Sequence, residues 1–341
     1  MELRPLGTSG VQTSVIGLGT WPMGGEWWGG TDDAEAIRTI HRAIDLGVTL
    51  IDTAEAYAHG HAEEVVGRAI AGRRHEVVIA DKVAADHLRP HEIRAAFEGS
   101  CRRLGTDYID VYFIHWPNID LPIADAIGEL ERLREAGYIR AIGVSNFTVD
   151  ELDEASRYGR VDVLQPPYNL FWRFCERAEV PYCRERSIGI MTYSSLAQGL
   201  LTGHLTSETV FPPGDQRPTT VLFQPEHYAR CLEAVAQLRP IAERYGKSVA
   251  QVALNWLVAQ PGVSTALVGA RTVREIEENA GAVGWTLAAD DLALVDRIGR
   301  GVTDALPPYP DMFGNWRRWE LQQRRYERIG RLPPEDESGT S

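Results

Sequence analysis

The sequence has 341 residues, 44% of them hydrophobic, and a formal net charge of −13 at pH 7. This length allows two average domains or one large α/β barrel, and without a basic block a nucleic-acid or anionic-membrane partner is not expected. No apolar stretch resembles a signal peptide or could span a bilayer, and the four cysteines show no CxxC spacing, so we expect a cytoplasmic protein with reduced thiols and no zinc or disulfide.

Repeated βα units are the main pattern along the chain. Short runs rich in Val, Ile and Leu alternate with longer amphipathic stretches, which is typical of such units. Residues 2–4 and 11–14 are predicted to form a small hairpin before the first unit. The strands are then predicted to end near Gly19, Asp52, Lys82, His115, Ser145, Gln165, Tyr193 and Gly269. Eight such units favour a closed (β/α)8 TIM barrel over an open doubly wound sheet.

The last interval between strands is long and holds an insertion at roughly residues 200–230. This segment is rich in Gly, Pro and Thr, and we expect a long loop after the seventh strand that gates or shapes a site at the catalytic face. A helix is predicted from Ser248, because apolar residues follow it at helical spacing.

The C-terminal part of the chain has a different composition. After about residue 302 it turns irregular and aromatic, and we expect it to lie over the barrel mouth; its aromatic residues include Tyr309, Phe313, Trp316 and Trp319. Residues 331–341 are polar and are predicted to form a disordered tail. The predicted organisation is therefore a single barrel domain over residues 1–330.

Four positions near predicted strand ends carry residues suited to proton transfer. Asp52 ends one apolar run, Tyr57 follows five residues later, and Lys82 and His115 end the next two runs. Alone, such a histidine is more often a satisfied core residue, and such a lysine can pair with a helix carboxylate. Together they suit proton donation to a carbonyl: Lys82, held charged by Asp52, would lower the pKa of Tyr57 toward the working range. His115 could orient the carbonyl oxygen.

The second half of the chain carries residues suited to binding a hydride donor. Ser145, Asn146 and Gln165 place hydroxyl and amide groups at two successive strand ends, where they can pair with the donor and the acceptor of a carboxamide. Tyr193 offers a flat face for a nicotinamide ring. The segment from Gly269 begins a helix, a natural site for phosphate and adenosine. Each feature alone is equally well explained as a strand-end turn or a helix cap.

The segment Gly17-Leu-Gly-Thr-Trp-Pro22 is not a Rossmann fingerprint, because it has proline where the third glycine is required. Gly19, Thr20 and Trp21 are expected to line the floor of the barrel mouth instead. Loop tryptophans could also line an apolar or sugar-stacking substrate pocket, although loop aromatics are as often part of a core; the candidates are Trp21, Trp28 and Trp116.

The order and spacing of these motifs resemble those of the aldo-keto reductase superfamily. The matching motifs are Asp52-Thr-Ala-x-x-Tyr57, Lys82, His115-Trp-Pro, Gly143-Val-Ser-Asn-Phe, Gln165-Pro-x-Tyr-Asn and Gly269-Ala-Arg…Glu278-Asn279. The resemblance runs from about residue 3 to 300. Within the superfamily, Trp27-Trp-Gly-Gly-Thr and Gln165-Pro-Pro-Tyr-Asn-Leu-Phe are most similar to the bacterial branch that contains inositol-operon-associated reductases.

The resemblance implies a (β/α)8 barrel that binds NADP(H) in extended form and acts on a small-molecule carbonyl or alcohol. It implies Tyr57 as general acid/base, Asp52 and Lys82 as the residues that tune it, and His115 as the residue that orients the carbonyl. It implies cofactor contacts from Gly19, Thr20, Trp21, Ser145, Asn146, Gln165, Tyr193, Ser194, Leu196, Gln198, Gly199, Gly269, Arg271, Glu275, Glu278 and Asn279. Among these, Arg271 would meet the 2′-phosphate.

Glu275 departs from many relatives, which have Arg or Gln at this position, four residues before Asn279. A carboxylate here would repel a 2′-phosphate and could accept hydrogen bonds from a ribose 2′-OH, while Arg271 and Arg274 would offset the repulsion. We therefore expect NADP(H) to be preferred, with use of NAD(H) possible.

The leading interpretation is an NAD(P)H-dependent oxidoreductase that interconverts an aldehyde, ketone or sugar and the corresponding alcohol. One alternative is a catalytically weak NADP(H)-binding regulatory or sensor subunit, as known among relatives that associate with channels. A metal-dependent barrel hydrolase is less favoured, because His59, His61 and His115 lack ligand spacing with carboxylates. The sequence leaves the oligomeric state open.

Overall fold

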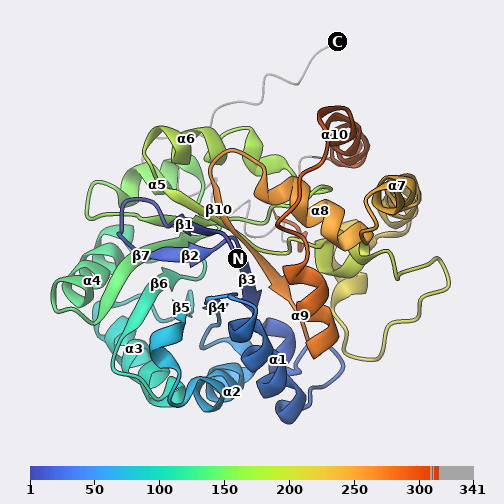
Figure 1. Ribbon diagram of the computed structural model, residues 1–341. Helices are drawn as coiled ribbons and strands as arrows, with labels where there is room; N and C mark the ends of the chain where they lie inside the picture. The colour runs from blue at the N-terminus through green and yellow to red at the C-terminus, as the bar shows by residue number, and fades with distance from the viewer. Residues whose placement is uncertain (308, 310, 315–341) are drawn as a thin grey trace.

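Eight parallel strands close into a barrel that is ringed by helices (Figure 1). The computed structural model describes residues 1–307, 309 and 311–314. The strands follow chain order around the barrel, and β10 closes it by pairing with β3 and β9. They are β3 (Ile16–Gly19), β4 (Leu50–Asp52), β5 (Val78–Val83), β6 (Ile109–Ile114), β7 (Ile139–Ser145), β8 (Val163–Gln165), β9 (Gly189–Thr192) and β10 (Val263–Gly269). The predicted TIM barrel is confirmed.

The helices cover the outside of the barrel, and several of them begin at a side-chain cap. At the start of α1, the Asp32 side chain accepts hydrogen bonds from the backbone N–H groups of Ala34 and Glu35, at 2.9 and 3.2 Å. Ser248 and Gln251 form a capping box at the start of α8, where a helix is predicted. The helices are α1 (Asp33–Asp45), α2 (His61–Ile70), α3 (Pro90–Leu104), α4 (Ile123–Glu135), α5 (Val149–Ala155), α6 (Glu179–Glu185), α7 (Pro225–Arg244), α8 (Val249–Val258), α9 (Val273–Ala280) and α10 (Ala289–Thr303).

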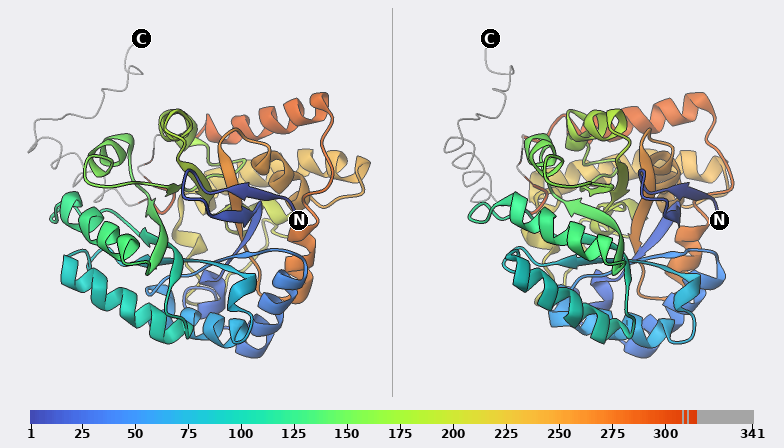
Figure 2. Two further views of the ribbon diagram at one scale, coloured as in Figure 1. Left: turned by 60° about the vertical axis from the view of Figure 1, so that its left-hand side comes forward. Right: turned by 90° about the vertical axis from the view of Figure 1, so that its left-hand side faces the viewer.

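The predicted N-terminal hairpin closes one end of the barrel (Figure 2). Its strands β1 (Leu3–Pro5) and β2 (Gln12–Ser14) pair antiparallel. Between them, the fully buried side chains of Leu6 and Val11 join the apolar cluster inside the barrel. The hairpin therefore seals the amino-terminal ends of the barrel strands and leaves the carboxyl ends as the open mouth.

The barrel interior is apolar toward the amino-terminal ends of the strands and polar at the mouth, where the carboxyl ends lie. Because alternate residues of a strand point to the same face, four of the polar residues at the mouth lie two positions after a buried apolar residue. The pairs are Leu50 and Asp52, Ala80 and Lys82, Phe113 and His115, and Val163 and Gln165. The same alternation that builds the core thus delivers the polar side chains to one layer.

The long loop predicted after the seventh barrel strand, which is β9, is present, but it ends earlier than predicted. Residues 193–224 contain short 3-10 turns and no α-helix or strand. Residues 225–230, which are predicted as part of this insertion, instead form the first turns of α7. Pro225 occupies the first turn of that helix, where its missing N–H costs no hydrogen bond.

The chain returns to the barrel mouth after α10. The backbone N–H of Val221 donates to the carbonyl of Met312 at 3.0 Å, and the Phe313 ring lies 6.1 Å from the Trp21 ring. Phe313 thus reaches the mouth, as predicted for this aromatic segment. Trp316, Trp319, the predicted boundary at 330 and the predicted disordered tail 331–341 lie outside the described residues. Within the described ranges, no helix combines the length and the hydropathy needed to cross a membrane.

Candidate active site

A cavity of about 930 Å³ opens at the carboxyl ends of the barrel strands, a size common for ligand sites. Asp52, Tyr57 and His115 line it. So do the predicted cofactor and substrate residues Gly19, Trp21, Trp28, Trp116, Ser145, Asn146, Gln165, Tyr193, Ser194, Leu196, Gln198, Gly199, Gly269, Arg271, Glu275, Glu278 and Asn279. Thr20 differs: it is fully buried behind this wall, where its hydroxyl donates to the Asp52 carbonyl at 2.9 Å.

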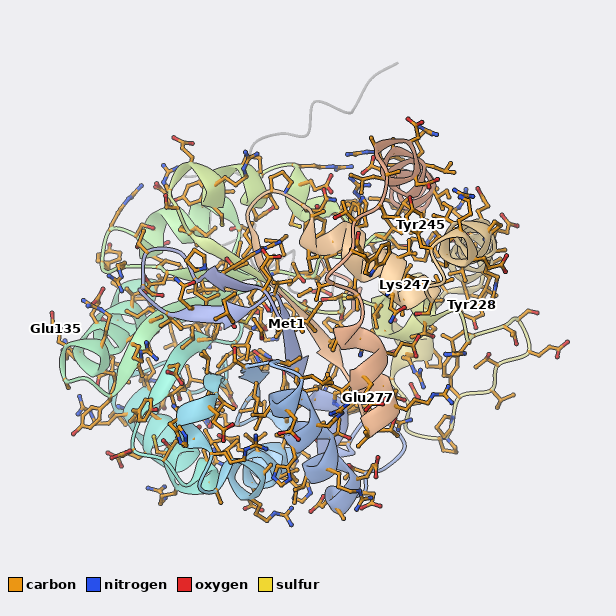
Figure 3. The ribbon with its side chains drawn as sticks, viewed as in Figure 1. Met1, Glu135, Tyr228, Tyr245, Lys247 and Glu277 are labelled. Atoms are coloured by element: carbon orange, nitrogen blue, oxygen red, sulfur yellow. The ribbon has the colours of Figure 1, made fainter. Side chains whose placement is uncertain are left out.

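Lys82 joins Asp52 and Tyr57 into one chain of contacts. Its Nζ lies 2.6 Å from Asp52 Oδ1 and 3.1 Å from the Tyr57 hydroxyl oxygen, and it also donates to the Thr53 carbonyl at 2.7 Å. These acceptors use all three N–H bonds of the ammonium, and the side chain is fully buried. The second lysine, Lys247, lies outside the barrel, as Figure 3 shows.

Tyr57 is placed by a turn with unusual backbone geometry. Ala58, His59 and Gly60 have φ values of 48°, 54° and 91°. Successive left-handed residues are costly when they are not glycine, so the surrounding fold must hold this turn in place. The turn lets the Tyr57 side chain lie back over the end of β4, within reach of Lys82.

The net shift in the pKa of Tyr57 runs opposite to the prediction. Burial raises the pKa of Tyr57 to about 12; the Lys82 charge lowers it and the Asp52 charge raises it, but burial is the largest effect. The predicted influence of Lys82 has the right sign but is outweighed. Although burial opposes its charge, the contacts with Asp52 and Tyr57 raise the pKa of Lys82. At neutral pH, Tyr57 therefore keeps its proton and Lys82 keeps its charge.

His115 lies beside the Tyr57 ring, with the ring centroids 5.7 Å apart and the planes nearly perpendicular. Burial, and then the charge of Lys82, lower the pKa of His115 well below its usual range. The imidazole is therefore neutral at neutral pH and has one N–H donor and one ring acceptor. A neutral donor at this position can bind a carbonyl oxygen without adding charge to the site.

The predicted carboxamide-binding residues form a second hydrogen-bonded group. The Ser145 hydroxyl donates to the Gln165 carbonyl at 2.9 Å, and Asn146 Nδ2 donates to Ser145 Oγ at 3.0 Å. The Tyr193 hydroxyl donates to Asn146 Oδ1 at 2.8 Å. Gln165 Nε2 donates to Asp52 Oδ2 at 2.8 Å. The group that suits a nicotinamide and the group that suits proton transfer are therefore in direct contact.

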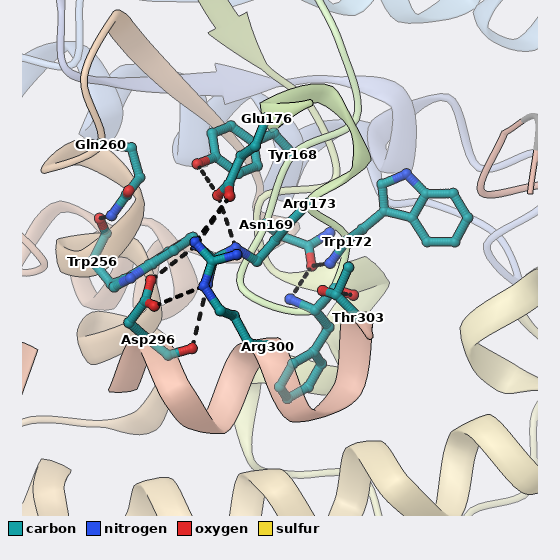
Figure 4. A network of polar contacts seen from close by, with 11 residues as sticks. Tyr168, Asn169, Trp172, Arg173, Glu176, Trp256, Gln260, Asp296, Arg300 and Thr303 are labelled. Atoms are coloured by element: carbon teal, nitrogen blue, oxygen red, sulfur yellow. Dashed lines mark hydrogen bonds and ion pairs between the residues drawn. The ribbon is translucent and has the colours of Figure 1, made fainter. Parts of the chain in front are cut away.

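A network of charged side chains fixes the loop after β8 to α8 and α10 (Figure 4). Arg173 is only 3% exposed, and its Nε lies 2.8 Å from Glu176 Oε1. Its Nη2 lies 2.9 Å from Asp296 Oδ1, and its guanidinium lies 4.6 Å from the Trp256 ring centroid. Arg300, from α10, contacts the same two carboxylates.

Asn169 connects this fixed loop to the end of β9. Its Oδ1 accepts hydrogen bonds from the backbone N–H groups of Phe171 and Trp172, and its Nδ2 donates to the Ser194 carbonyl at 3.0 Å. Ser194 has a φ of 52°, so its left-handed backbone needs such support. Asn169 ends the Gln165-Pro-x-Tyr-Asn motif, but the sequence analysis gave it no role; the usable signal was its place after Tyr168, since asparagine favours turns.

The end of the cavity near α9 holds the residues predicted to meet adenosine. The Glu275 carboxylate accepts a hydrogen bond from the backbone N–H of Arg271 at 2.6 Å. The Arg271 side chain donates to the Trp28 carbonyl at 3.1 Å. Asn279 Nδ2 donates to the Gly269 carbonyl at 3.4 Å. Glu275 therefore lies at this end of the cavity together with Arg271 and Arg274.

Two residues of the long loop that the sequence prediction missed, Gln216 and Arg217, also line the cavity. Composition predicts the loop but not which side chains face the site. Arg217 pairs with the buried Asp215 at 2.6 Å and lies 5.4 Å from the Trp28 ring centroid. The loop thus contacts the segment that follows β3.

Three buried donors in the cavity wall indicate what kind of ligand fits. Gln198 Nε2, Gln216 Nε2 and Trp28 Nε1 have no hydrogen-bond partner among the residues that the structure describes. A buried donor without a partner is costly. These donors suit a ligand rich in acceptor oxygens, such as a nicotinamide dinucleotide with its pyrophosphate.

The histidines considered for a metal site are dispersed. His61 pairs with Asp33 at 2.9 Å on the outside of the barrel, whereas His115 lies at the mouth. In the part of the chain that is described, no three or more His, Cys, Asp or Glu side chains are placed to hold a metal ion.

Comparison with known proteins identifies the family. Residues 15–300 match the model of the aldo/keto reductase family. The chain is 43% identical to aldo-keto reductase YhdN of Bacillus subtilis (strain 168), over 87% of this chain and 93% of the relative. It is 34% identical to the NADH-specific methylglyoxal reductase of Escherichia coli (strain K12), over 89% and 99%. Among solved structures, an aldo/keto reductase from Klebsiella pneumoniae in complex with NADP and acetate is similar, with a TM-score of 0.72 and 32% identity over 87% and 95%.

Proposed function

This chain belongs to the aldo/keto reductase family, and on that premise we propose that it is an oxidoreductase that interconverts a carbonyl group and an alcohol, with Tyr57 as general acid and base. The proposed substrates are small aldehydes, ketones or sugars. The observation that carries the proposal is the unbroken contact from Asp52 through Lys82 to the Tyr57 hydroxyl at the cavity wall.

The proposed chemistry divides between the cofactor and the chain. A nicotinamide, when bound, supplies or accepts the hydride. Tyr57 donates its phenolic proton to the oxygen that gains negative charge, and Lys82 stabilises the phenolate left behind. Asp52 keeps the buried Lys82 charged. His115 donates a hydrogen bond to the same oxygen and so orients the carbonyl. In the reverse direction, the same groups remove the proton from an alcohol.

The residues proposed to hold the cofactor follow the cavity from the tetrad to α9. Ser145, Asn146 and Gln165 would bind the carboxamide, and Tyr193 would stack on the ring. The Nε2 groups of Gln198 and Gln216, which have no partner among the described residues, would bind phosphate oxygens, as would the backbone of the turn that contains Leu196 and Gly199. Arg271, Glu278 and Asn279 would bind the adenosine end.

We propose NADP(H) as the preferred cofactor and NAD(H) as a second one. Arg271 and Arg274 near α9 favour a 2′-phosphate, in keeping with the NADP in the Klebsiella structure. Glu275 favours a ribose 2′-OH, in keeping with the NADH-specific Escherichia coli relative.

Two substitutions should change the cofactor preference in opposite directions. Arg271→Ala is expected to lower kcat/KM for NADPH by about tenfold or more, because a charge-assisted contact to phosphate is lost. It should leave kcat/KM for NADH within about threefold. Glu275→Gln should raise the ratio of NADPH to NADH efficiency. A wild-type protein with a large preference for NADH would contradict the role given to Arg271.

A panel of carbonyl compounds tests the proposed activity. Methylglyoxal, an aromatic aldehyde, a ketone and an aldose are each offered with NADPH and with NADH, and oxidation of the nicotinamide is followed by absorbance. We expect turnover that a chelator does not change. Tight NADP(H) binding without turnover of any carbonyl would favour the regulatory or sensor subunit instead.

Three further proposals rest on the sequence. The motifs around Trp27 and Gln165 support assigning the chain to the bacterial branch that contains inositol-operon-associated reductases. The reduced-thiol pattern supports a cytoplasmic location, and the continuous βα pattern supports one domain over residues 1–330.

A further inference from the structure

Building on the proposed function, we propose that Asp52 has a second role beside its contact with Lys82. Its second carboxylate oxygen, Oδ2, fixes the orientation of the Gln165 amide and so decides which edge of that amide meets the cofactor. Gln165 then connects the proton-transfer residues to the nicotinamide site, because it contacts Asp52 and also lines the cavity. Asp52 thus acts as a positioning residue for cofactor binding.

The geometry places both oxygens of Asp52 in use. Oδ1 lies 2.6 Å from Lys82 Nζ, and Oδ2 lies 2.8 Å from Gln165 Nε2. Asp52 and Gln165 are each 2% exposed, so water does not compete for this contact. In the barrel order, β4 and β8 lie four strands apart. The Gln165 contact therefore crosses the mouth between opposite strands.

The chemistry of the two groups allows only one orientation of the amide. An ionised carboxylate accepts hydrogen bonds and cannot donate, so the amide edge beside Asp52 must be the NH2 edge. The same Nε2 lies 3.1 Å from the Met191 sulfur, a weak acceptor. Since Gln165 also lines the cavity, the edge left for a ligand is Oε1, an acceptor. A carboxamide would then meet Gln165 through its own NH2 group.

The charged and titratable groups around this contact come from several elements. Lys82 on β5 pairs with Asp52 directly. Tyr57, on the loop after β4, bonds to Lys82, and the neutral His115, after β6, lies beside the Tyr57 ring. From β9, Met191 contributes a sulfur and no charge. A new acid at position 165 would therefore face Asp52 as its nearest titratable neighbour.

The Gln165→Glu substitution tests this arrangement because it keeps the shape of the side chain. Two ionised carboxylates at this distance repel each other, so one of them takes up a proton as the pH falls. The protonated form again presents a donor to Asp52 and a carbonyl oxygen to the cavity, which restores the original pattern.

The measurement is the affinity for NADP⁺, obtained from quenching of tryptophan fluorescence at pH 5.5 and pH 8. Each value is expressed relative to the wild type at the same pH, so that ionisation of the cofactor cancels. We expect Gln165→Glu to weaken binding by about tenfold or more at pH 8 and by less than about threefold at pH 5.5. Gln165→Leu, which cannot titrate, should weaken binding equally at both pH values.

The Asp52→Asn/Gln165→Glu double variant is a second test, and it keeps the inference testable if the single variant fails to fold. An amide at position 52 can donate to the new carboxylate, so the pH dependence seen in the single variant should disappear. If the single variant unfolds at pH 8, the double variant should fold there, which thermal unfolding would show.

Two results would overturn the inference. If the wild type binds NADP⁺ and Gln165→Glu shows the same deficit at both pH values, Asp52 does not orient Gln165, and the proposed function is untouched. If the wild type binds neither NADP⁺ nor NADPH, the proposed function itself fails.

Discussion

The protonation of Tyr57 is decided by competing effects on one phenol. Tyr57 lines the cavity and is partly buried. This burial raises the pKa of Tyr57 to about 12, and the nearby ammonium of Lys82 only partly offsets the effect. A phenol that keeps its proton at neutral pH is ready to donate to a carbonyl. The opposite reaction needs the phenolate, which is scarce at neutral pH.

Because carbonyl reduction needs the protonated phenol and alcohol oxidation needs the phenolate, the rates of the two reactions should depend differently on pH. With the pKa of Tyr57 raised to about 12, the phenolate fraction grows about tenfold per pH unit throughout the range below that value. Alcohol oxidation should therefore rise continuously from pH 7 to 10, while carbonyl reduction should not gain. Pre-steady-state rates at saturating cofactor would show this, and a plateau in oxidation below pH 9 would contradict it.

Lys82 and Asp52 depend on each other as a buried ion pair. Lys82→Met removes the cation and leaves the buried Asp52 carboxylate, among the described side chains, with its Gln165 contact alone, so we expect the free energy of unfolding to fall by about 3–5 kcal/mol. The Lys82→Met/Asp52→Asn double variant removes both charges and should lose less. Denaturant unfolding measures both; a double variant less stable than the single one would contradict the ion-pair account.

At the scale of elements, the strands were predictable because the local signal and the tertiary role agree. Apolar runs end in polar residues where strands leave the barrel, so the predicted ends at Gly19, Asp52, Ser145 and Gln165 match those of β3, β4, β7 and β8. Helix α7 was not predicted, because the predicted Gly-, Pro- and Thr-rich insertion extends to about residue 230, whereas Pro225 suits the first turn of a helix.

The loop after β8 gains its shape from partners far along the chain. Arg173 reaches Asp296 on α10 and Trp256 on α8 (Figure 4), and no local sequence pattern encodes these distant contacts. Through Asn169, the same loop supports Ser194 at the cavity wall. The fold of this loop is therefore a tertiary property.

Two arginines of this network provide a matched comparison. Arg173→Met is expected to lower the free energy of unfolding by about 3–5 kcal/mol, because loss of the buried guanidinium leaves the carboxylates of Glu176 and Asp296 without their main partner. Arg300→Met changes a side chain that is 51% exposed and contacts the same carboxylates, and it should cost about 1 kcal/mol or less. Equal losses in the two variants, measured by denaturant unfolding, would contradict the network described here.

For the whole molecule, the barrel brings distant polar residues together at one end, while the hairpin seals the other (Figure 2). The sequence predicted most of the cavity wall, because those residues lie at strand ends that must share one face. It could not predict the contact between Asp52 and Gln165, which are 113 positions apart and meet only when the barrel closes. Nor could it give the net pKa shift of Tyr57, which depends on how deeply the closed mouth buries the phenol.

The most direct test of the central claim is a single-turnover measurement with the Tyr57→Phe variant. NADPH-loaded protein is mixed with an excess of the best carbonyl from the panel, and the Kd for NADPH is measured in parallel by fluorescence titration. We predict that Tyr57→Phe binds NADPH within about threefold of the wild type but transfers hydride about 100-fold more slowly or worse, because the proton donor is missing. A variant that binds NADPH normally and keeps more than about a tenth of the wild-type rate would contradict the role of Tyr57.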